Sequence, residues 1–503
     1  MSEAETIARL NEQIERLDAE NRLLRQKIDL LVRQVFGSGK SEKLSPDQLQ
    51  LLLGDETPEH PEASVAAPTV AEAPKKTQQR PPRRPRFPEN LPVEEEILDP
   101  APVKAMPWLY RQIGEEISEQ LDYEPGRFKL KKLVRRTYVK RNDPDAAPLT
   151  AALPPKLLER GQLAPGLLAH VVVGKYADHL PLYRQERIFK QRHDVHLGRN
   201  TLCRGVELVA DWLRPVAGLM FEQQLAGGYV QLDETPVQYL APGRGKTAKG
   251  FLWVSNSPQN KETVFHWAPG RGYEHLKRWL PDNFNCIIQT DEYQPYNKLE
   301  KALELPAHAA CWTHVRRRFF KAHEVGDHRA RNGWILHQIG LLYGIEKRLR
   351  EQKAGPKLRA AVRQSESQPI LNRLFNVLGT MFDSREYKPQ SLTGTALSYA
   401  LRQREGLQVY VERGQVEIDN NGVENAIRPA ALGRKNWMFI GDKDAGWRSA
   451  VIYTILSSCK SCGIDPYAYL KDVLERLPHM TNQQLDQITP RAWAKEKKIK
   501  LAS

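Results

Sequence analysis

The hydrophobic period of this 503-residue chain changes near Gly227, and this change constrains the fold more than any other feature. Before it, apolar residues recur every three to four positions, whereas "GGYVQLDETPVQYL", "GFLWVSNS" and "KETVFHW" alternate apolar and polar residues. The first period is typical of amphipathic helices and the second of half-buried strands. A helix ("YEHLKRWL") and an apolar strand ("CIIQTDEYQPY") follow. This order predicts an α/β or α+β core with an antiparallel edge.

The first 36 residues carry a heptad repeat. Leucine occupies every d position, and isoleucine or valine occupies every a position except Asn21. This combination favours a parallel two-stranded coiled coil, in which a central Asn fixes the register. The alternative is an amphipathic helix packed on its own protein. We expect a homo-oligomer that is at least a dimer.

Residues 37–108 form a proline-rich linker that becomes strongly basic at "KKTQQRPPRRPR". Proline keeps such a segment extended, so its arginines could follow a DNA backbone or a minor groove. A solvated spacer is the alternative. The linker arginines concerned are Arg80, Arg83, Arg84 and Arg86. Residues 109–145 then read as a β-hairpin that turns at Pro125-Gly126, with an acidic first arm and a basic second arm.

Residues 146–225 are predicted to be helical and to contain a helix-turn-helix. One helix ends near Gln191, a polar break follows, and the next helix starts around Arg199. The start of a second helix in such a motif enters the major groove of DNA. Two helices and a turn also occur in helical domains of other kinds. The candidate base-reading residues are Arg199, Asn200, Thr201 and Arg204.

Charge and cysteine content narrow the class of protein. The 75 Lys and Arg residues exceed the 61 Asp and Glu residues, and the net charge of +14 favours a polyanionic partner such as nucleic acid. Five scattered cysteines suit a reducing compartment better than a disulfide framework. No run approaches the roughly eighteen apolar residues of a membrane span. We expect an intracellular, cytoplasmic protein with no membrane partner.

Three carboxylates occur where the local pattern does not require them. Asp233 lies inside a strand, Asp291 follows another strand, and Glu424 lies in the first turn of a late helix. Each has a structural alternative, since Asp291 could cap the next helix and Glu424 could complete a capping box with Asn421. As a set, however, they have the layout that holds two divalent cations about 3.5 to 4 Å apart for phosphoryl transfer. Mg²⁺ prefers such oxygen ligands.

The chain resembles the DDE transposases of the insertion sequence sixty-six family, the TnpC-type proteins, over nearly its whole length. The resemblance lies in the zipper ending in "GSGKSEKL", the hairpin, the helix-turn-helix, and the segments "LDETPV", "TDEYQPY", "DNNGVENAIRPAALGRKNWMFIG" and "GIDPYAYL". It implies a ribonuclease H-like catalytic domain with Asp233, Asp291 and Glu424 as its acidic triad. Glu234 is then a neighbour of the triad and not a ligand.

The resemblance also implies two Mg²⁺ or Mn²⁺ ions per active site and a bacterial, nucleoid-associated protein. Its partners would be double-stranded DNA, as the element's terminal inverted repeats and as target, and small accessory proteins encoded by the same element are further candidates. The expected catalytic domain comprises residues 226–324 and 406–450, separated by a helical insertion (325–405) and followed by a helical tail (451–503). A DNA-binding regulator without catalysis and a nuclease that cuts without joining are the rival functions.

The zinc site of the family and several residues near the triad need separate consideration. The family usually carries two zinc-binding cysteine pairs beside the hairpin, but no cysteine precedes Cys203 here, so we expect no zinc site there. His314 could approach the scissile phosphate or be structural. Arg428, four residues after Glu424, could pair with it or hold a phosphate. A basic and aromatic cluster could bind an unpaired base or surround a core tryptophan; it comprises Arg434, Lys435 and Trp437.

Overall fold

The computed structural model describes residues 126, 128–131, 137–138, 149–150, 154–159, 161–241 and 246–502. The expected coiled coil, the linker with its four arginines and most of the expected hairpin lie outside these residues. The chain divides into two compact units, and the described residues from Lys131 onward belong to one of them. None of the described helices combines the length and apolar character needed to cross a membrane.

Among the described residues, two short strands and three helices precede the sheet. Strands β1 (Thr137–Tyr138) and β2 (Leu149–Thr150) pair antiparallel, so the basic arm of the expected hairpin pairs with residues that follow it. The helices are α4 (Pro165–Tyr176), α5 (Leu182–His193) and α6 (Arg199–Ala226). The predicted pair of helices around a polar break is therefore confirmed. The first of them ends where Asp194 adopts a left-handed backbone conformation (φ 53°).

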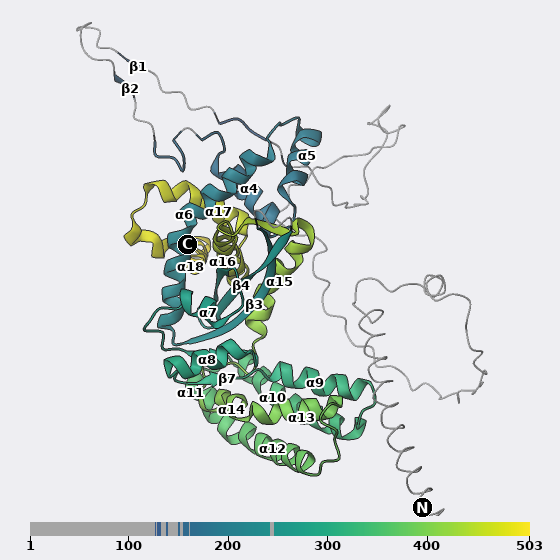
Figure 1. The fold of residues 1–503 in the computed structure, drawn as a ribbon. Coiled ribbons are helices and arrows are strands. Elements are labelled where there is room, and N and C mark those ends of the chain that lie inside the picture. The colour runs from purple at the N-terminus through teal and green to yellow at the C-terminus, as the bar shows by residue number, and fades with distance from the viewer. Residues whose placement is uncertain are drawn as a thin grey trace, which may run out of the picture. The chain divides into compact units, whose positions relative to one another are not determined.

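The centre of this unit is a mixed six-stranded sheet (Figure 1), which confirms the predicted α/β or α+β core. Its strand order is β5-β4-β3-β6-β7, and β8 also pairs with β3. β3–β4 and β4–β5 are antiparallel, whereas β6 and β8 run parallel to β3, and β7 runs parallel to β6. The strands are β3 (Tyr229–Leu240), β4 (Thr247–Ser257), β5 (Glu262–Ala268), β6 (Ile287–Gln289), β7 (His308–Ala309) and β8 (Phe439–Asp442).

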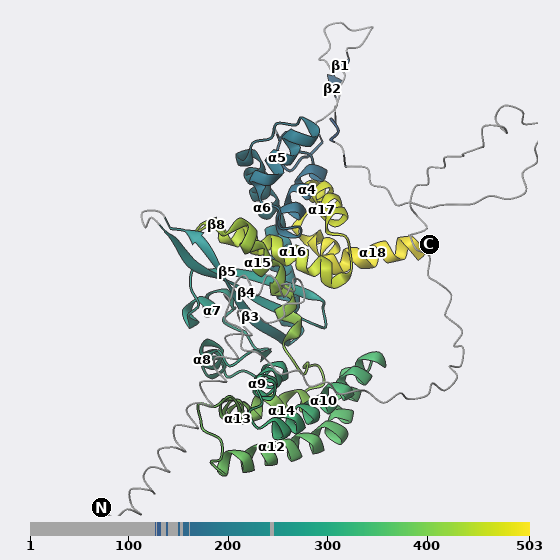
Figure 2. The same cartoon turned by 90° about the vertical axis from the view of Figure 1, so that its right-hand side faces the viewer.

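Helices cover both faces of the sheet. On β5, Phe265 packs on Tyr453 of α16 (Gly446–Cys462), and the next residue, His266, stacks on Trp279 of α7 (Tyr273–Trp279). Because successive strand residues point to opposite faces, α16 and α7 lie on opposite sides of the sheet. α8 (Gln294–Leu303) joins α7 over a shared apolar cluster, and α15 (Asn421–Trp437) packs on β3 (Figure 2).

The edge strand β5 is protected by side chains of α16. The backbone N–H groups of Thr263 and Phe265 donate hydrogen bonds to Ser458 Oγ and Thr454 Oγ1 at 3.0 and 2.9 Å. An unpaired strand edge is otherwise a template for association with another chain. Helix α16 thus protects the open edge of the sheet. The helices α17 (Pro466–Arg476) and α18 (Pro490–Ala502) follow it in the chain.

The region between β7 and α15 is helical, and it contains the expected insertion, residues 325–405. Its helices are α9 (Trp312–Glu324), α10 (Arg329–Glu351), α11 (Pro356–Val362), α12 (Gln368–Asp383), α13 (Leu392–Arg402) and α14 (Arg404–Glu412). A fully buried ion pair joins Arg363 Nε to Glu346 Oε1 at 2.7 Å. Arg359 contacts Glu417 at 2.8 Å, which attaches the insertion to the segment that returns to α15.

Glu262, the first residue of β5, is a buried carboxylate that should make stability depend on pH. Its residue is 1% exposed, and neither carboxylate oxygen has a hydrogen-bond partner among the described residues. Burial raises the pKa of Glu262 from 4.5 to about 7, against the opposing charge of Arg491. The folded state therefore holds this proton more tightly than the unfolded state does. The resulting stabilisation is present below pH 4.5 and is lost as the pH rises through 7.

We expect Glu262→Gln to raise the midpoint of chemical unfolding at pH 8 and to change it little at pH 5. The amide removes the cost of ionising a buried carboxyl group, which lowers wild-type stability by up to about 1.4 kcal/mol per pH unit across this window. Unfolding followed by tryptophan fluorescence at both pH values measures the effect. Parallel pH dependence of the two proteins would refute this assignment. Glu412→Gln, which changes an exposed glutamate, is the matched control.

Candidate functional site

Asp233 lies where one edge of β3 has no strand partner. On that edge β3 pairs with β6 through Tyr229–Gln231 and with β8 through Gln238–Leu240. Residues 232–237 have no strand partner on that side within the described chain. The sheet therefore opens at Asp233, and the opening leaves room beside its carboxylate for groups from other elements.

Side chains from α15 and the segment before it complete the backbone hydrogen bonding in this opening. Asn420 Nδ2 donates to the carbonyl oxygen of Leu232 at 3.1 Å, and Arg434 Nη1 donates to that of Pro236 at 2.6 Å. Buried carbonyl groups are costly to leave without donors. These two bonds attach both ends of the opening to α15 and its N-terminal approach.

Asp291 lies level with Asp233 because β3 and β6 run parallel in a fixed register. Gln231 is opposite Gln289, and each aspartate follows its glutamine by two residues. Gln231 Nε2 donates to Gln289 Oε1 at 3.0 Å, and both glutamines are buried. The repeated pattern Gln-x-Asp is the sequence signal that could have predicted this pairing.

The same two glutamines position the segment that leads into α15. Gln231 Nε2 donates to the carbonyl oxygen of Asp419, and Gln289 Nε2 donates to that of Glu417, both at 2.8 Å. α15 begins two residues after Asp419, and Glu424 lies in its first turn. The buried amides therefore bring Glu424 to the two strands that carry Asp233 and Asp291.

The three acids interact electrostatically. Burial raises the pKa of Asp233 from 3.8 to about 8, and the charges of Glu234, Asp291 and Glu424 act in the same direction. The backbone N–H of Glu234 donates to Asp233 Oδ1 at 2.8 Å and opposes the shift. A desolvated carboxylate among like charges is stabilised in its ionised form by a cation. The arrangement therefore suits a positively charged ligand.

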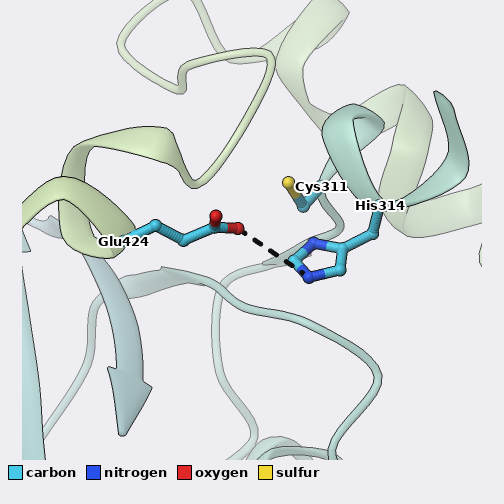
Figure 3. A group of neighbouring side chains, drawn as sticks. All are labelled: Cys311, His314 and Glu424. Atoms are coloured by element: carbon cyan, nitrogen blue, oxygen red, sulfur yellow. Dashed lines mark ion pairs between the residues drawn. The ribbon is translucent and has the colours of Figure 1, made fainter. Parts of the chain in front are cut away.

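Glu424 faces α9 and does not cap its own helix. Its carboxylate lies 3.8 Å from His314 Nε2 (Figure 3) and 3.6 Å from Arg317 Nη2. α15 has no side-chain cap hydrogen bond, so the capping-box alternative is absent from the structure. Burial lowers the pKa of His314, while Glu424 and Asp291 oppose that shift. No sequence motif indicates Arg317, because its contact with Glu424 depends on how α9 packs.

Cys311, one turn before His314, completes a group whose possible ligand atoms lie within 4.8 Å of one another (Figure 3). Burial raises the pKa of the Cys311 thiol to about 12, and its Sγ accepts the backbone N–H of Asn420 at 3.3 Å. A neutral thiol is a poor ligand for a hard cation, which prefers oxygen. Glu424 is the better ligand for such a cation, since its Oε1 is buried without a hydrogen-bond partner among the described residues.

The neighbouring acids Glu234 and Asp419 have other partners. Glu234 accepts hydrogen bonds from Arg271 Nε at 2.7 Å and from Tyr296 Oη at 2.5 Å. Asp419 accepts bonds from the backbone and the side chain of Asn421 at 3.1 and 2.9 Å. Both carboxylates thus already accept hydrogen bonds from protein groups.

The candidate DNA-binding residues on α15 differ in their surroundings. Arg428 and Lys435 are exposed, and the ion pairs of Glu424 within the described chain are with α9 and not with Arg428. Arg434 donates a hydrogen bond to the carbonyl oxygen of Pro236, so it stabilises β3. Trp437 is half-buried, with its indole Nε1 shielded from solvent.

The candidate base-reading residues lie together at the start of α6. Arg199, Asn200, Thr201 and Arg204 are all exposed, whereas Leu202 between them is fully buried. An amphipathic helix of this kind buries one face and leaves the other available for a ligand. The linker residues Arg80, Arg83, Arg84 and Arg86 lie outside the described residues.

Comparison with known proteins assigns the family. The model described as "Transposase IS66 family" matches residues 160–448, more than half of the chain. The models "IS66 C-terminal element" and "Transposase C of IS166 homeodomain" match residues 454–490 and 23–95.

Two similar proteins come from Sinorhizobium fredii (strain NBRC 101917 / NGR234). Uncharacterized protein y4qI is 34% identical over 416 residues, which cover 79% of this chain and 76% of that protein. Uncharacterized protein y4jD is 31% identical over 491 residues, which cover 93% and 94% of the two chains. On the extent of the family match, this chain belongs to the IS66 family of transposases.

Proposed function

We propose that this protein is a DDE transposase that binds the terminal inverted repeats of its element, cleaves the ends to free 3′-hydroxyl groups and joins them to target DNA. The observation that carries the proposal is the approach of Asp233, Asp291 and Glu424 at the opening of the sheet. A protein that only bound DNA would have no use for three carboxylates set against one another. The catalytic core is then ribonuclease H-like.

DDE transposases generally use divalent metal ions, and the three carboxylates fit such a ligand. Asp233, Asp291 and Glu424 would hold two Mg²⁺ or Mn²⁺ ions, which supply activation of the attacking oxygen and stabilisation of charge on the phosphate. The buried Oε1 of Glu424, which accepts no hydrogen bond from the described residues, and the desolvated Asp233 are the features of this chain that support the fit.

The protein's own residues have separable tasks in this proposal. The Gln231–Gln289 pair keeps the strands and the approach to α15 in register, so the three acids retain their relative positions. His314 and Arg317 contact Glu424 and orient its carboxylate. The exposed start of α6 would read the element end, the basic linker would bind phosphates, and the N-terminal zipper would dimerise the protein.

A strand-transfer assay with labelled element ends and a supercoiled target tests the proposal. The transposase should produce nicked or cut ends and joined products in Mg²⁺ or Mn²⁺ and neither in EDTA. Cutting without joining would identify a nuclease, and end binding without cutting would identify a DNA-binding regulator. Either result would reject the proposed function.

A further inference from the structure

We propose that Arg271 binds a DNA phosphate next to the scissile bond and that Glu234 holds its guanidinium group in place for this purpose. The inference rests on the proposed function and adds a metal-independent contact to the same site. Arg271 lies in the turn between β5 and α7, outside every motif that the sequence indicated.

Glu234 points to the opposite face of β3 from Asp233, so its carboxylate is available to Arg271. Arg271 therefore reaches the site on the side of Asp291, through Tyr293. Glu234 Oε1 accepts a hydrogen bond from Arg271 Nε at 2.7 Å and lies 2.5 Å from Nη2. Its Oε2 accepts a bond from Tyr296 Oη on α8. The Glu234 side chain is only 3% exposed, so the residue beside Asp233 is a buried anchor for one arginine.

A second contact connects Arg271 to the neighbourhood of Asp291. The guanidinium group lies over the ring of Tyr293, 3.7 Å from its centroid, and Tyr293 Oη donates to the carbonyl oxygen of Arg271 at 2.9 Å. The backbone N–H of Tyr293 donates in turn to Asp291 Oδ1 at 2.9 Å. Arg271 is thus held by Glu234, which follows Asp233, and by Tyr293, which lies two positions after Asp291.

The guanidinium group keeps binding capacity after these contacts are made. The Arg271 side chain is 45% exposed, and Nη1 has no hydrogen-bond partner within the described chain. Arg363 shows the contrasting structural case, since its side chain is 0% exposed and its Nη1 donates to the carbonyl groups of Tyr410 and Val416. Exposed arginines elsewhere also bind carboxylates, as Arg402 binds Glu292, but the Glu292 side chain is 27% exposed, whereas Glu234 is a buried anchor.

Charge explains why a phosphate contact is needed at this place. In the proposed function the DNA backbone approaches three carboxylates, and cations held by them would offset only part of the repulsion at neighbouring phosphates. A planar guanidinium group binds phosphate oxygens with a fixed geometry, and stacking on an aromatic ring restricts its motion. Arg271 therefore provides a fixed positive charge at the rim of the site.

The test combines single phosphate neutralisation with protein variants. Full-length protein is titrated, in Ca²⁺ without turnover, with duplexes from the end of its own element that carry one methylphosphonate at each phosphate within three nucleotides of the cleaved bond. We expect Arg271→Gln to weaken binding of the unmodified duplex by about tenfold. At one phosphate, Arg271→Gln and the methylphosphonate together should lower the binding affinity no more than either change alone, because both remove the same contact.

The controls separate this role from others. Arg373→Gln removes an exposed arginine on α12. Any loss of affinity that it causes should multiply with the loss caused by each methylphosphonate. Arg271→Lys keeps the positive charge and should recover part of the affinity for the duplex. If Arg271→Gln does not fold, Arg271→Lys is combined with each methylphosphonate in its place. Multiplicative losses at all positions for both Arg271 variants would overturn the inference. Wild-type protein that neither binds nor cuts the duplex would instead reject the proposed function.

Discussion

Asp233→Asn, Asp291→Asn and Glu424→Gln are each expected to abolish both cleavage and strand transfer, with a loss of at least about a thousandfold in rate. Each amide keeps the size of the side chain but removes the negative charge that would hold a divalent cation. Binding to the element ends should remain within about twofold of wild type, because the start of α6 lies outside the triad. Gel-based cleavage and joining assays, with binding measured separately, give the result.

The double and triple variants should lose little more activity than the single ones, since residues that act as a unit are not additive. Glu234→Gln and Asp419→Asn should keep measurable activity, because these acids bind Arg271 and Asn421. An active Glu424→Gln enzyme would remove Glu424 from the proposed ligand set and make Asp419 the next candidate.

Replacing Arg199 and Arg204 by Ala is expected to erase the preference for element ends over unrelated DNA. Each base contact by an arginine contributes about 1 to 3 kcal/mol of discrimination, so two contacts together exceed a tenfold preference. Competition binding against a scrambled duplex measures the ratio. Both side chains are exposed, so the fold should tolerate the change.

The matched experiment neutralises the linker residues Arg80, Arg83, Arg84 and Arg86. Affinity for all DNA should fall alike, and the log-log salt slope should decrease by roughly 0.9 for each lost phosphate contact. An equal loss of specificity from both sets of variants would show that the assignment of reading to α6 is wrong.

The local elements could be predicted from the sequence because their causes are local. The period of two between Gly227 and Leu240 gave β3, and the polar break after Gln191 gave the end of α5 and the start of α6. The placement of Asp233 within a strand and of Glu424 in a first helical turn followed from the same periods. Family motifs then assigned these residues to a triad without any knowledge of distances.

The tertiary structure decided which side chains contact one another in the candidate site. The sequence allowed Glu424 to cap α15, yet its carboxylate faces His314 and Arg317, more than 100 positions earlier in the chain. Glu234 could have been read as a second ligand, but Arg271 and Tyr296 occupy its oxygens. Such choices depend on strand register and on helix packing between distant segments, where many pairings have similar local energies. Only the complete fold, by burying Gln231 against Gln289 and opening β3 at Asp233, selects one of them.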